Sequence, residues 1–271
     1  MVTSSTLHNP SFLLSRLRAS SPLVQCITNH VAMNITANVL LAAGASPAMV
    51  YAPEESGKFA QIAAALIVNI GTLSLYSVAG MKQAAAVFQA QAKPWVLDPV
   101  AHFATSFRQQ TIAELLAFQP TLLRGNASEI IALAGGTSQG HGVDSGDDVA
   151  AAKSAARLLA QKHKMIIAVT GITDFVTDGQ RGAFIEGGSA WMPKVTALGC
   201  ALTGLCGAFL AIAPEHPYEA TIAALASFAV AGQQAGKTAQ GTGSFAVQFL
   251  DKLSMLEGER AFSDMAPIRY A

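Results

Sequence analysis

The chain has 271 residues, of which 51% are hydrophobic and 13% are charged, a composition that favours a large core and extensive burial. Lysine and arginine together number 17, as do aspartate and glutamate, so the formal net charge is zero and argues against nucleic acid or an anionic membrane as partners. The length fits one large α/β domain or two small ones, and because no stretch resembles an interdomain linker we expect one domain over residues 1–271.

Short apolar runs that are typical of buried strands alternate along the chain with alanine-rich stretches that are typical of helices. The predicted strands are residues 46–51, 65–70, 94–100, 121–124 and 165–170. The predicted helices are residues 32–43, 54–64, 75–91, 106–118 and 147–163. Because strands that alternate with helices pair in parallel, we expect a mostly parallel central sheet with helices on both faces.

The alternation ends after residue 173. Residues 174–186 predict a β-hairpin, with Asp178-Gly179 as its turn. Only helical patterns follow, and they cover residues 201–213, 218–240 and 244–256. The polar segment 135–148 lies between two helical patterns and is the longest candidate loop.

The cysteines, Cys26, Cys200 and Cys206, are odd in number and scattered, and no CxxC pair occurs. They therefore predict neither a disulfide framework nor a zinc site. The chain begins without the basic-then-apolar pattern of a signal peptide, and its apolar stretches are interrupted or too short to span a bilayer, which takes about 20 residues. We expect a cytoplasmic protein with reduced thiols.

Cys200 stands, with Gly199, directly before the helical run that begins at Ala201. The amino end of a helix offers unpaired N–H groups, here those of Gly199, Cys200 and Ala201, which bind phosphate and lower the pKa of a nearby thiol. This segment could hold an anion and a base side by side, as phosphoryl transfer requires. A purely structural Cys200 is the alternative, because cysteine is among the most buried residue types.

Polar side chains follow several predicted strands, where an open parallel sheet gathers its ligands. Asn69, Asp98, Arg124 and Thr170 each end an apolar run. Arginine suits bidentate phosphate binding, so we favour a nucleotide contact for Arg124 over a salt bridge to Asp98 or Glu129. Because the sequence lacks a GxxxxGK[ST] loop, any nucleotide site must use another arrangement.

Asn126 and Glu129 have the spacing of a helix capping box. The same amide and carboxylate oxygens are ligands that Mg²⁺ prefers. With Asp98 at a neighbouring strand end and no local basic partner, we favour a magnesium site formed by Asp98, Asn126 and Glu129.

Seven short segments follow one another in an order that is typical of one family. They are Cys26-Ile27-Thr28-Asn29, Gly44-Ala45-Ser46-Pro47-Ala48-Met49, Asn69-Ile70-Gly71-Thr72-Leu73, Leu97-Asp98-Pro99-Val100, Arg124-Gly125-Asn126-Ala127-Ser128-Glu129, Val169-Thr170-Gly171 and Gly199-Cys200-Ala201-Leu202. Together they resemble hydroxyethylthiazole kinase, a thiamin-pathway member of the ribokinase-like superfamily. The resemblance covers the chain from about residue 21 to about residue 256.

The resemblance implies ATP-dependent phosphorylation of the primary hydroxyl of 4-methyl-5-(2-hydroxyethyl)thiazole, giving the thiazole phosphate for thiamin synthesis. It also implies Mg²⁺, a three-layer α/β ribokinase-like fold, and a homotrimer with active sites between subunits. The residues that it assigns share the predicted strand ends and the turn before residue 201. They are Asn29, Met49 and Ala197 at the thiazole alcohol, Arg124, Thr170 and Gly199 at ATP, Asp98, Asn126 and Glu129 at Mg²⁺, and Cys200 where most ribokinase-like enzymes carry an aspartate base.

Ala197-Leu198 departs from the family pattern, which reads Gly-Thr at these positions. If the backbone at residue 197 required a positive φ, alanine would be strained there. Leu198 removes a hydroxyl close to the expected phosphates. Two alternatives therefore stay open, a kinase for a related small alcohol such as hydroxymethylpyrimidine and a non-catalytic protein that binds thiazole or nucleotide.

Overall fold

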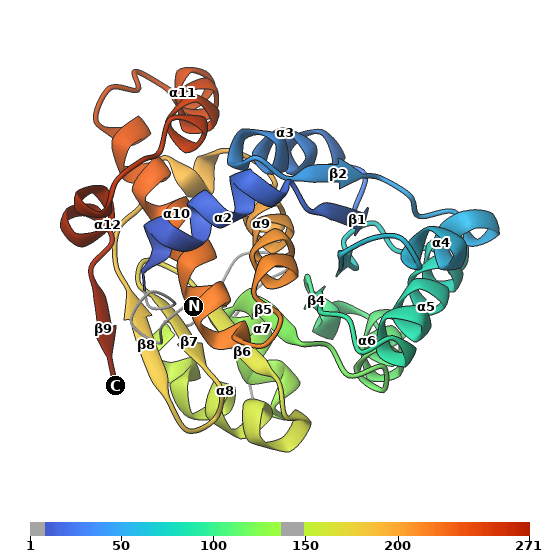
Figure 1. Cartoon of the computed structure of the whole chain (residues 1–271). Coiled ribbons are helices and arrows are strands. Elements are labelled where there is room, and N and C mark those ends of the chain that lie inside the picture. The colour runs from blue at the N-terminus through green and yellow to red at the C-terminus, as the bar shows by residue number, and fades with distance from the viewer. Residues whose placement is uncertain (1–8, 137–148) are drawn as a thin grey trace.

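The computed structural model describes residues 9–136 and 149–271, which form one nine-stranded sheet with helices on both faces (Figure 1). The strand order in the sheet is β2-β1-β3-β4-β5-β6-β7-β8-β9. The strands are β1 (Leu23–Ile27), β2 (Ser46–Ala48), β3 (Ala65–Asn69), β4 (Trp95–Asp98), β5 (Leu122–Asn126), β6 (Ile166–Thr170), β7 (Asp174–Thr177), β8 (Gly182–Ile185) and β9 (Ile268–Tyr270). Strands β1 to β6 pair in parallel, and β7, β8 and β9 extend the sheet in antiparallel fashion.

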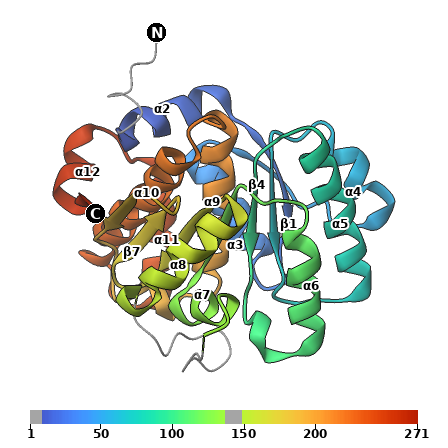
Figure 2. The same cartoon turned by 90° about the horizontal axis from the view of Figure 1, so that it is seen from below.

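Both faces of the parallel strands are covered. One helical layer packs over each face, which Figure 2 shows edge-on, and this arrangement confirms the predicted three-layer α/β architecture. The first layer contains α2 (Pro10–Ser20), α3 (Met33–Ala43), α9 (Leu198–Ile212), α10 (Pro217–Gly236), α11 (Thr242–Ser254) and α12 (Glu259–Met265). The second contains α4 (Pro53–Ala60), α5 (Leu75–Ala90), α6 (Ser106–Leu116), α7 (Ala127–Leu133) and α8 (Val149–His163). Short 3₁₀ helices are η1 (His102–Ala104) and η2 (Met192–Lys194).

The parallel strands end in register at one edge of the sheet. Asn69 of β3 pairs with Asp98 of β4, and Asn126 of β5 pairs with Thr170 of β6. In β3, β4 and β6 the residues before these ends are apolar and buried, so these three strands present polar residues only where they stop, whereas β5 also carries Arg124 two residues before its end. This register brings together side chains that lie far apart in the sequence.

Helix α9 is apolar along almost its whole length and packs against β1, β3 and β4. Gly207 permits the close approach, because a Cβ there would lie 2.6 Å from Ile67 of β3. With its body fixed in this way, α9 points its first turn at the edge where the parallel strands end.

Most predicted elements are confirmed, with shifted ends. Strand β2 stops at Ala48, three residues before the predicted end, and α10 stops at Gly236 rather than at residue 240. Helix α9 begins at Leu198, so Cys200 lies inside its first turn and not before it. Residues 137–148 of the predicted loop, and the start of the predicted helix 147–163, lie outside the described residues.

Four elements, β1, α2, α12 and β9, were not predicted from the sequence. Gln25 interrupts the apolar run of β1, yet it is fully buried because its amide donates to Val50 O and to Ser56. In the described part of the chain, no helix is both long and apolar enough to cross a membrane.

Candidate active site

The candidate site lies at the edge where β1 and β3 to β6 end. The strand order places β1 between β2 and β3, so the chain leaves β1 and β3 in opposite directions, and in open parallel sheets ligands bind beyond the carboxyl ends of strands at such a point. Asn29 follows β1 and Asn69 ends β3, and their side chains meet across this point, with Asn29 Nδ2 2.8 Å from Asn69 Oδ1.

Asp98, at the end of β4, is the centre of the cluster and is fully buried. Its Oδ2 accepts hydrogen bonds from Asn69 Nδ2 at 2.8 Å and from Thr203 Oγ1, on α9, at 2.7 Å. Burial raises the pKa of Asp98, and Arg124 and the hydrogen-bond donors only partly oppose that shift. Among the described residues, its Oδ1 is buried without a hydrogen-bond partner.

Arg124 reaches from β5 into the same cluster. Its Nη1 lies 3.5 Å from Asp98 Oδ2, and its Nη2 donates to Thr170 Oγ1. A Cβ at Gly199 would lie 2.9 Å from Nη2, so the glycine leaves room for the guanidinium beside the first turn of α9. Burial disfavours the charge of the Arg124 guanidinium, but the negative charges of Asp98 and Glu129 outweigh burial and raise the pKa of Arg124. The salt bridge to Asp98 that we had placed second is therefore present.

Cys200 is the third residue of α9 and is partly exposed. Its Sγ receives a hydrogen bond from Asn29 Nδ2 at 3.3 Å. Burial, followed by the charge of Asp98, raises the pKa of Cys200 to about 11, although Arg124 acts in the opposite direction. Desolvation thus outweighs the expected effect of the helix terminus, and the thiol is neutral at pH 7.

The first turn of α9 offers free backbone N–H donors, but Ala201, which was predicted to be one of them, is not. Ala201 N donates to Ala197 O at 2.9 Å and so belongs to the helix ladder. Because the helix begins at Leu198, the N–H groups outside the ladder are those of Leu198, Gly199 and Cys200.

Ala197 precedes this turn in a left-handed conformation, with φ 62° and ψ 11°. Such a backbone favours glycine and costs an L-residue about 1–2 kcal/mol. A positive φ is the condition under which alanine was expected to be strained at this position, and the structure meets it.

Asn126 and Glu129 form the capping box at the start of α7. Glu129 N donates to Asn126 Oδ1 at 2.9 Å, and Asn126 N donates to Glu129 Oε2 at 2.8 Å. Glu129 Oε1 accepts from Ala101 N at 2.9 Å. Burial, followed by the charge of Asp98, raises the pKa of Glu129 to about 7. The capping alternative is present, and each carboxylate oxygen still has a second lone pair.

The donor set fits a hydrated divalent cation. Asp98 Oδ1 is an orphaned acceptor, and two buried carboxylates with raised pKa values share one nearby guanidinium. Within residues 9–136 and 149–271, no group of three or more His, Cys, Asp or Glu side chains could hold a metal unaided. Mg²⁺ would suit such a partial set, since it keeps water ligands and binds substrate phosphates.

Met49 lies one residue beyond β2, at the same edge of the sheet, and packs against the apolar core of the first layer. Because β2 pairs with β1, Met49 lies just past the end of the strand next to the one that leads to Asn29. Thr203 was not among the predicted site residues, although it is a polar residue in the apolar first half of α9. Asn69 was recognised as a polar strand end, but no role was predicted for it.

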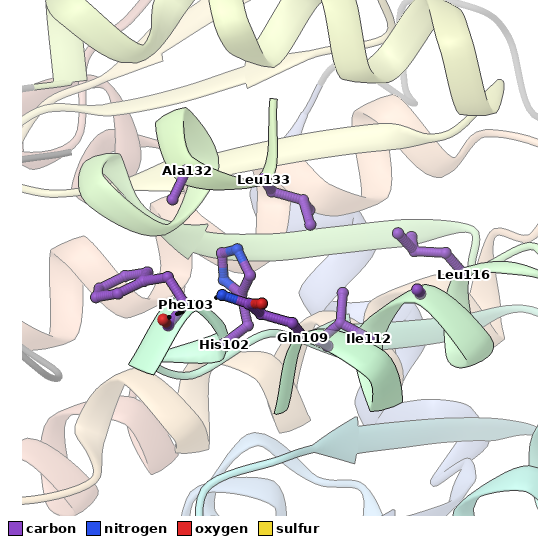
Figure 3. Close-up of a pocket in the computed structure, with 8 residues that line it drawn as sticks. His102, Phe103, Gln109, Ile112, Leu116, Ala132 and Leu133 are labelled. Atoms are coloured by element: carbon purple, nitrogen blue, oxygen red, sulfur yellow. Dashed lines mark hydrogen bonds between the residues drawn. The ribbon is translucent and has the colours of Figure 1, made fainter. Parts of the chain in front are cut away.

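A separate cavity of about 250 Å³ opens between α6 and α7 (Figure 3). In Figure 3 the imidazole of His102 is directed toward Ala132 and Leu133. Burial lowers the pKa of His102. The predicted site residues do not line this cavity.

Comparisons with known proteins identify a family and a fold. A family model described as "Hydroxyethylthiazole kinase family" matches residues 14–259. The chain is 62% identical to hydroxyethylthiazole kinase of Rhizobium rhizogenes, over 96% of both chains. It is similar to the solved structure of a hydroxyethylthiazole kinase protein from Pyrococcus horikoshii OT3, with a TM-score of 0.87, 35% identity and coverage of 97% and 98% of the two chains.

A more distant likeness supports the fold alone. The structure of pyridoxal kinase from Staphylococcus aureus in complex with ADP matches with a TM-score of 0.64 at 15% identity, over 92% of this chain and 98% of that one. A solved ribokinase-like superfamily protein from Enterococcus faecalis matches with the same TM-score. These neighbours confirm a ribokinase-like fold.

Proposed function

The chain belongs to the hydroxyethylthiazole kinase family and uses ATP to phosphorylate hydroxyethylthiazole for thiamin synthesis. We propose that this reaction takes place at the cluster around Asp98. One observation carries the placement. Hydrogen bonds and an ion pair link Cys200, Asn29, Asn69, Asp98, Arg124 and Thr170 in a continuous chain beside the first turn of α9.

ATP would bind with its terminal phosphate at this turn. The N–H groups of Gly199 and Cys200 point out of the helix ladder, and the partial positive charge of the helix end favours an anion. Arg124 and Thr170 would contact the other phosphate oxygens. Losing one preorganised donor to a developing negative charge typically costs about 2.7–4 kcal/mol.

Asp98, Asn126 and Glu129 would hold Mg²⁺, with Asp98 Oδ1 as the acceptor that still lacks a partner in the described structure. When bound there, Mg²⁺ would offset the charge that phosphoryl transfer spreads over the phosphate oxygens. The oxygens of Glu129 already accept from Ala101 N and Asn126 N. Glu129 would therefore contact the cation through the second lone pair of a carboxylate oxygen.

The thiazole alcohol would lie between Met49, Asn29 and the backbone of Ala197, with its hydroxyl toward Cys200. Cys200, as the thiolate, would accept the hydroxyl proton while the alcohol oxygen forms its bond to the γ-phosphorus of ATP. The bond from that phosphorus to the β,γ-bridging oxygen breaks in the same step, and ADP leaves. Because the pKa of Cys200 is about 11 in the free protein, the thiolate is a small minority at pH 7. Below that pKa, kcat/KM should therefore rise with pH.

Cys200→Ala tests the base assignment. We expect kcat to fall by about 10²- to 10⁴-fold with ATP binding nearly intact. Cys206→Ala, in the same helix and fully buried, should lower stability and leave kcat per folded molecule unchanged. ADP release is measured with the thiazole alcohol, with hydroxymethylpyrimidine and with no alcohol. A Cys200→Ala turnover within about threefold of the parent would refute the base, and ADP release with the pyrimidine alone would refute the substrate.

The same proposal includes a homotrimer with active sites between subunits. Large apolar side chains are exposed near the site, at Val31 (59%), Leu75 (79%) and Tyr76 (48%), and a subunit interface over them would remove this apolar surface from water. Sedimentation equilibrium should give a mass near three chains. A cytoplasmic location belongs to the proposal as well, because the free thiols of Cys26, Cys200 and Cys206 suit a reducing compartment.

A further inference from the structure

The side chain of Asn69 lies buried between two groups of the proposed mechanism, and only 1% of the residue is exposed. Its Oδ1 accepts from Asn29 Nδ2 at 2.8 Å and from Gly71 N at 2.9 Å. Its Nδ2 donates to Asp98 Oδ2 at 2.8 Å. The side chain therefore touches Asp98 directly. It reaches Cys200 through Asn29 and is also close enough to help lower the pKa of that thiol itself.

Backbone donors determine which way these amides point. Gly71 N can only donate, so the Asn69 atom beside it must be the oxygen. Ala32 N, at 3.0 Å, likewise requires the Asn29 oxygen on its own side. The Asn29 nitrogen then faces both Asn69 Oδ1 and Cys200 Sγ, and it has one hydrogen for each.

Asn29 is also held from the other side. A Cβ at Gly71 would lie 2.6 Å from Asn29 Cβ and 2.7 Å from its Nδ2, so the backbone of Gly71 lies directly against this amide. A donor fixed in this way favours negative charge on the sulfur that it faces.

Asn69 acts on Asp98 in a similar manner. Together with Thr203 Oγ1 and Arg124 Nη1, its Nδ2 surrounds Asp98 Oδ2 with donors. Oδ1 is thereby left as a buried acceptor with no hydrogen-bond partner among the described residues, and the proposed cation would use it.

We propose that Asn69 is a positioning residue that couples the two halves of the reaction: it aims the Asn29 donor at Cys200 and holds Asp98 with Oδ1 available. This inference rests on the proposed function. Asn69 itself touches neither the expected alcohol nor the expected phosphates.

Alkylation of Cys200 by iodoacetamide at pH 8, located by mass spectrometry, tests the link to the sulfur without turnover. Cys26 and Cys206 are fully buried, so Cys200 is the accessible thiol of the described chain. In Asn69→Ala the alkylation rate should fall about five- to tenfold, because the thiolate loses its oriented donor. Simple loosening of the site would instead expose the sulfur and speed alkylation.

Kinetics give the second readout. Asn69→Ala should lower kcat about tenfold or more and leave KM for ATP within about threefold, since the nucleotide contacts stay in place. Thr203→Val is the matched control: it removes a donor from the same Asp98 oxygen but keeps Asn29 anchored, so Cys200 alkylation should stay within about twofold of the parent. Asn69→Ser replaces Asn69→Ala if that variant does not fold, with the same expected direction.

The outcomes are separable from those of the proposed function. Unchanged or faster alkylation of Cys200 in the Asn69 variant would overturn the inference, as would an equal slowing in Thr203→Val. If alkylation slows while Cys200→Ala keeps its kcat, the positioning role of Asn69 stands and the base assignment fails.

Discussion

Two clusters in this protein contain the same residue types, one arginine with one aspartate and one glutamate, yet they differ in geometry. In the cluster beside the β7–β8 hairpin, Arg181 Nε donates to Asp178 Oδ2 and Arg181 Nη1 donates to Glu219 Oε1, each at 2.7 Å. Burial opposes the charge of Asp178, but hydrogen bonds from Arg181 and the backbone outweigh it and lower the pKa of Asp178.

In the candidate site, the arginine pairs less closely with the two carboxylates. Arg124 approaches Asp98 only to 3.5 Å, and Glu129 accepts from backbone amides instead of from the guanidinium. The pKa values of Asp98 and Glu129 are raised rather than lowered, mainly by burial.

We propose that this difference separates a cluster that only stabilises the fold from one that binds a cation. Each carboxylate of the hairpin cluster has its cation in the structure, partly open to solvent. The site buries more negative charge than its arginine offsets, which costs stability unless a cation binds. Residue type alone does not distinguish the two clusters, whereas burial and pairing geometry do.

The sharpest test of this contrast exchanges one atom in each cluster. Asp98→Asn should lower kcat about 10²- to 10³-fold, because an amide nitrogen cannot replace a carboxylate oxygen at a cation. Its stability at pH 7 should not fall, because a costly buried charge is removed. Steady-state ADP release and urea denaturation measure the two effects.

Asp178→Asn is the matched exchange in the hairpin cluster. Here kcat should stay at the parent value, and the free energy of unfolding should fall by about 0.2–1 kcal/mol, as for an exposed ion pair. If both variants lost stability and neither lost kcat, the functional distinction between the clusters would be wrong.

The next largest effect concerns the arginines. Arg124→Ala should raise KM for ATP about 10- to 100-fold and KM for the thiazole alcohol much less, since a hydrogen bond to a charged group contributes about 1.5–3 kcal/mol. Initial rates at varied ATP and at varied alcohol measure this split. Arg181→Ala, the control, should leave both KM values unchanged, and an unchanged ATP KM in Arg124→Ala would remove that residue from the nucleotide site.

Much of the frame behind this contrast could be predicted from the sequence. Alternating strand and helix patterns gave the parallel sheet, and the rule that ligands gather at carboxyl ends pointed to Asp98, Arg124 and Thr170. Strand β1 was not predicted because its central residue, Gln25, is polar. The contacts of its amide with Val50 and Ser56, which appear only in the fold, explain its burial.

The finer features of the site depend on tertiary contacts. The hydrogen bond between Asn29 and Asn69 joins residues 40 positions apart in the sequence, and neither side chain has a local motif that predicts it. The ionisation of Cys200 was equally hidden: its place at a helix end predicts a lowered pKa, but burial, which appears only in the fold, raises it.

A third prediction concerns stability and pH. The folded pKa of Glu129 is about 7, above its ordinary value of 4.5, so between these values the unfolded chain releases a proton that the folded protein keeps. Stability from this group is therefore present below about pH 4.5 and is lost as pH rises through 7. Asp178, with a lowered pKa, has the opposite sign and acts only in more acidic solution.

Urea denaturation between pH 5 and pH 8 should show this loss, on the order of 1–3 kcal/mol, as a difference between the parent and Glu129→Gln. The glutamine keeps an acceptor for the capping contacts and does not titrate. Added Mg²⁺ should restore stability to the parent at pH 8 more than at pH 5. Parallel pH profiles of the two proteins would show that Glu129 is not held at a raised pKa.

The smallest expected effect concerns backbone strain at Ala197 in the candidate site. Ala197→Gly should stabilise the protein by about 1 kcal/mol, or about 2–4 °C in Tm, because glycine adopts φ 62° without the penalty that alanine carries. Ala92→Gly, at φ 51° in an exposed turn before β4, is the matched control and should give a similar gain. If strain at residue 197 shapes the alcohol pocket, only Ala197→Gly should change KM for the thiazole alcohol. Equal Tm gains with unchanged KM in both variants would mean that the left-handed alanine is merely tolerated at the site.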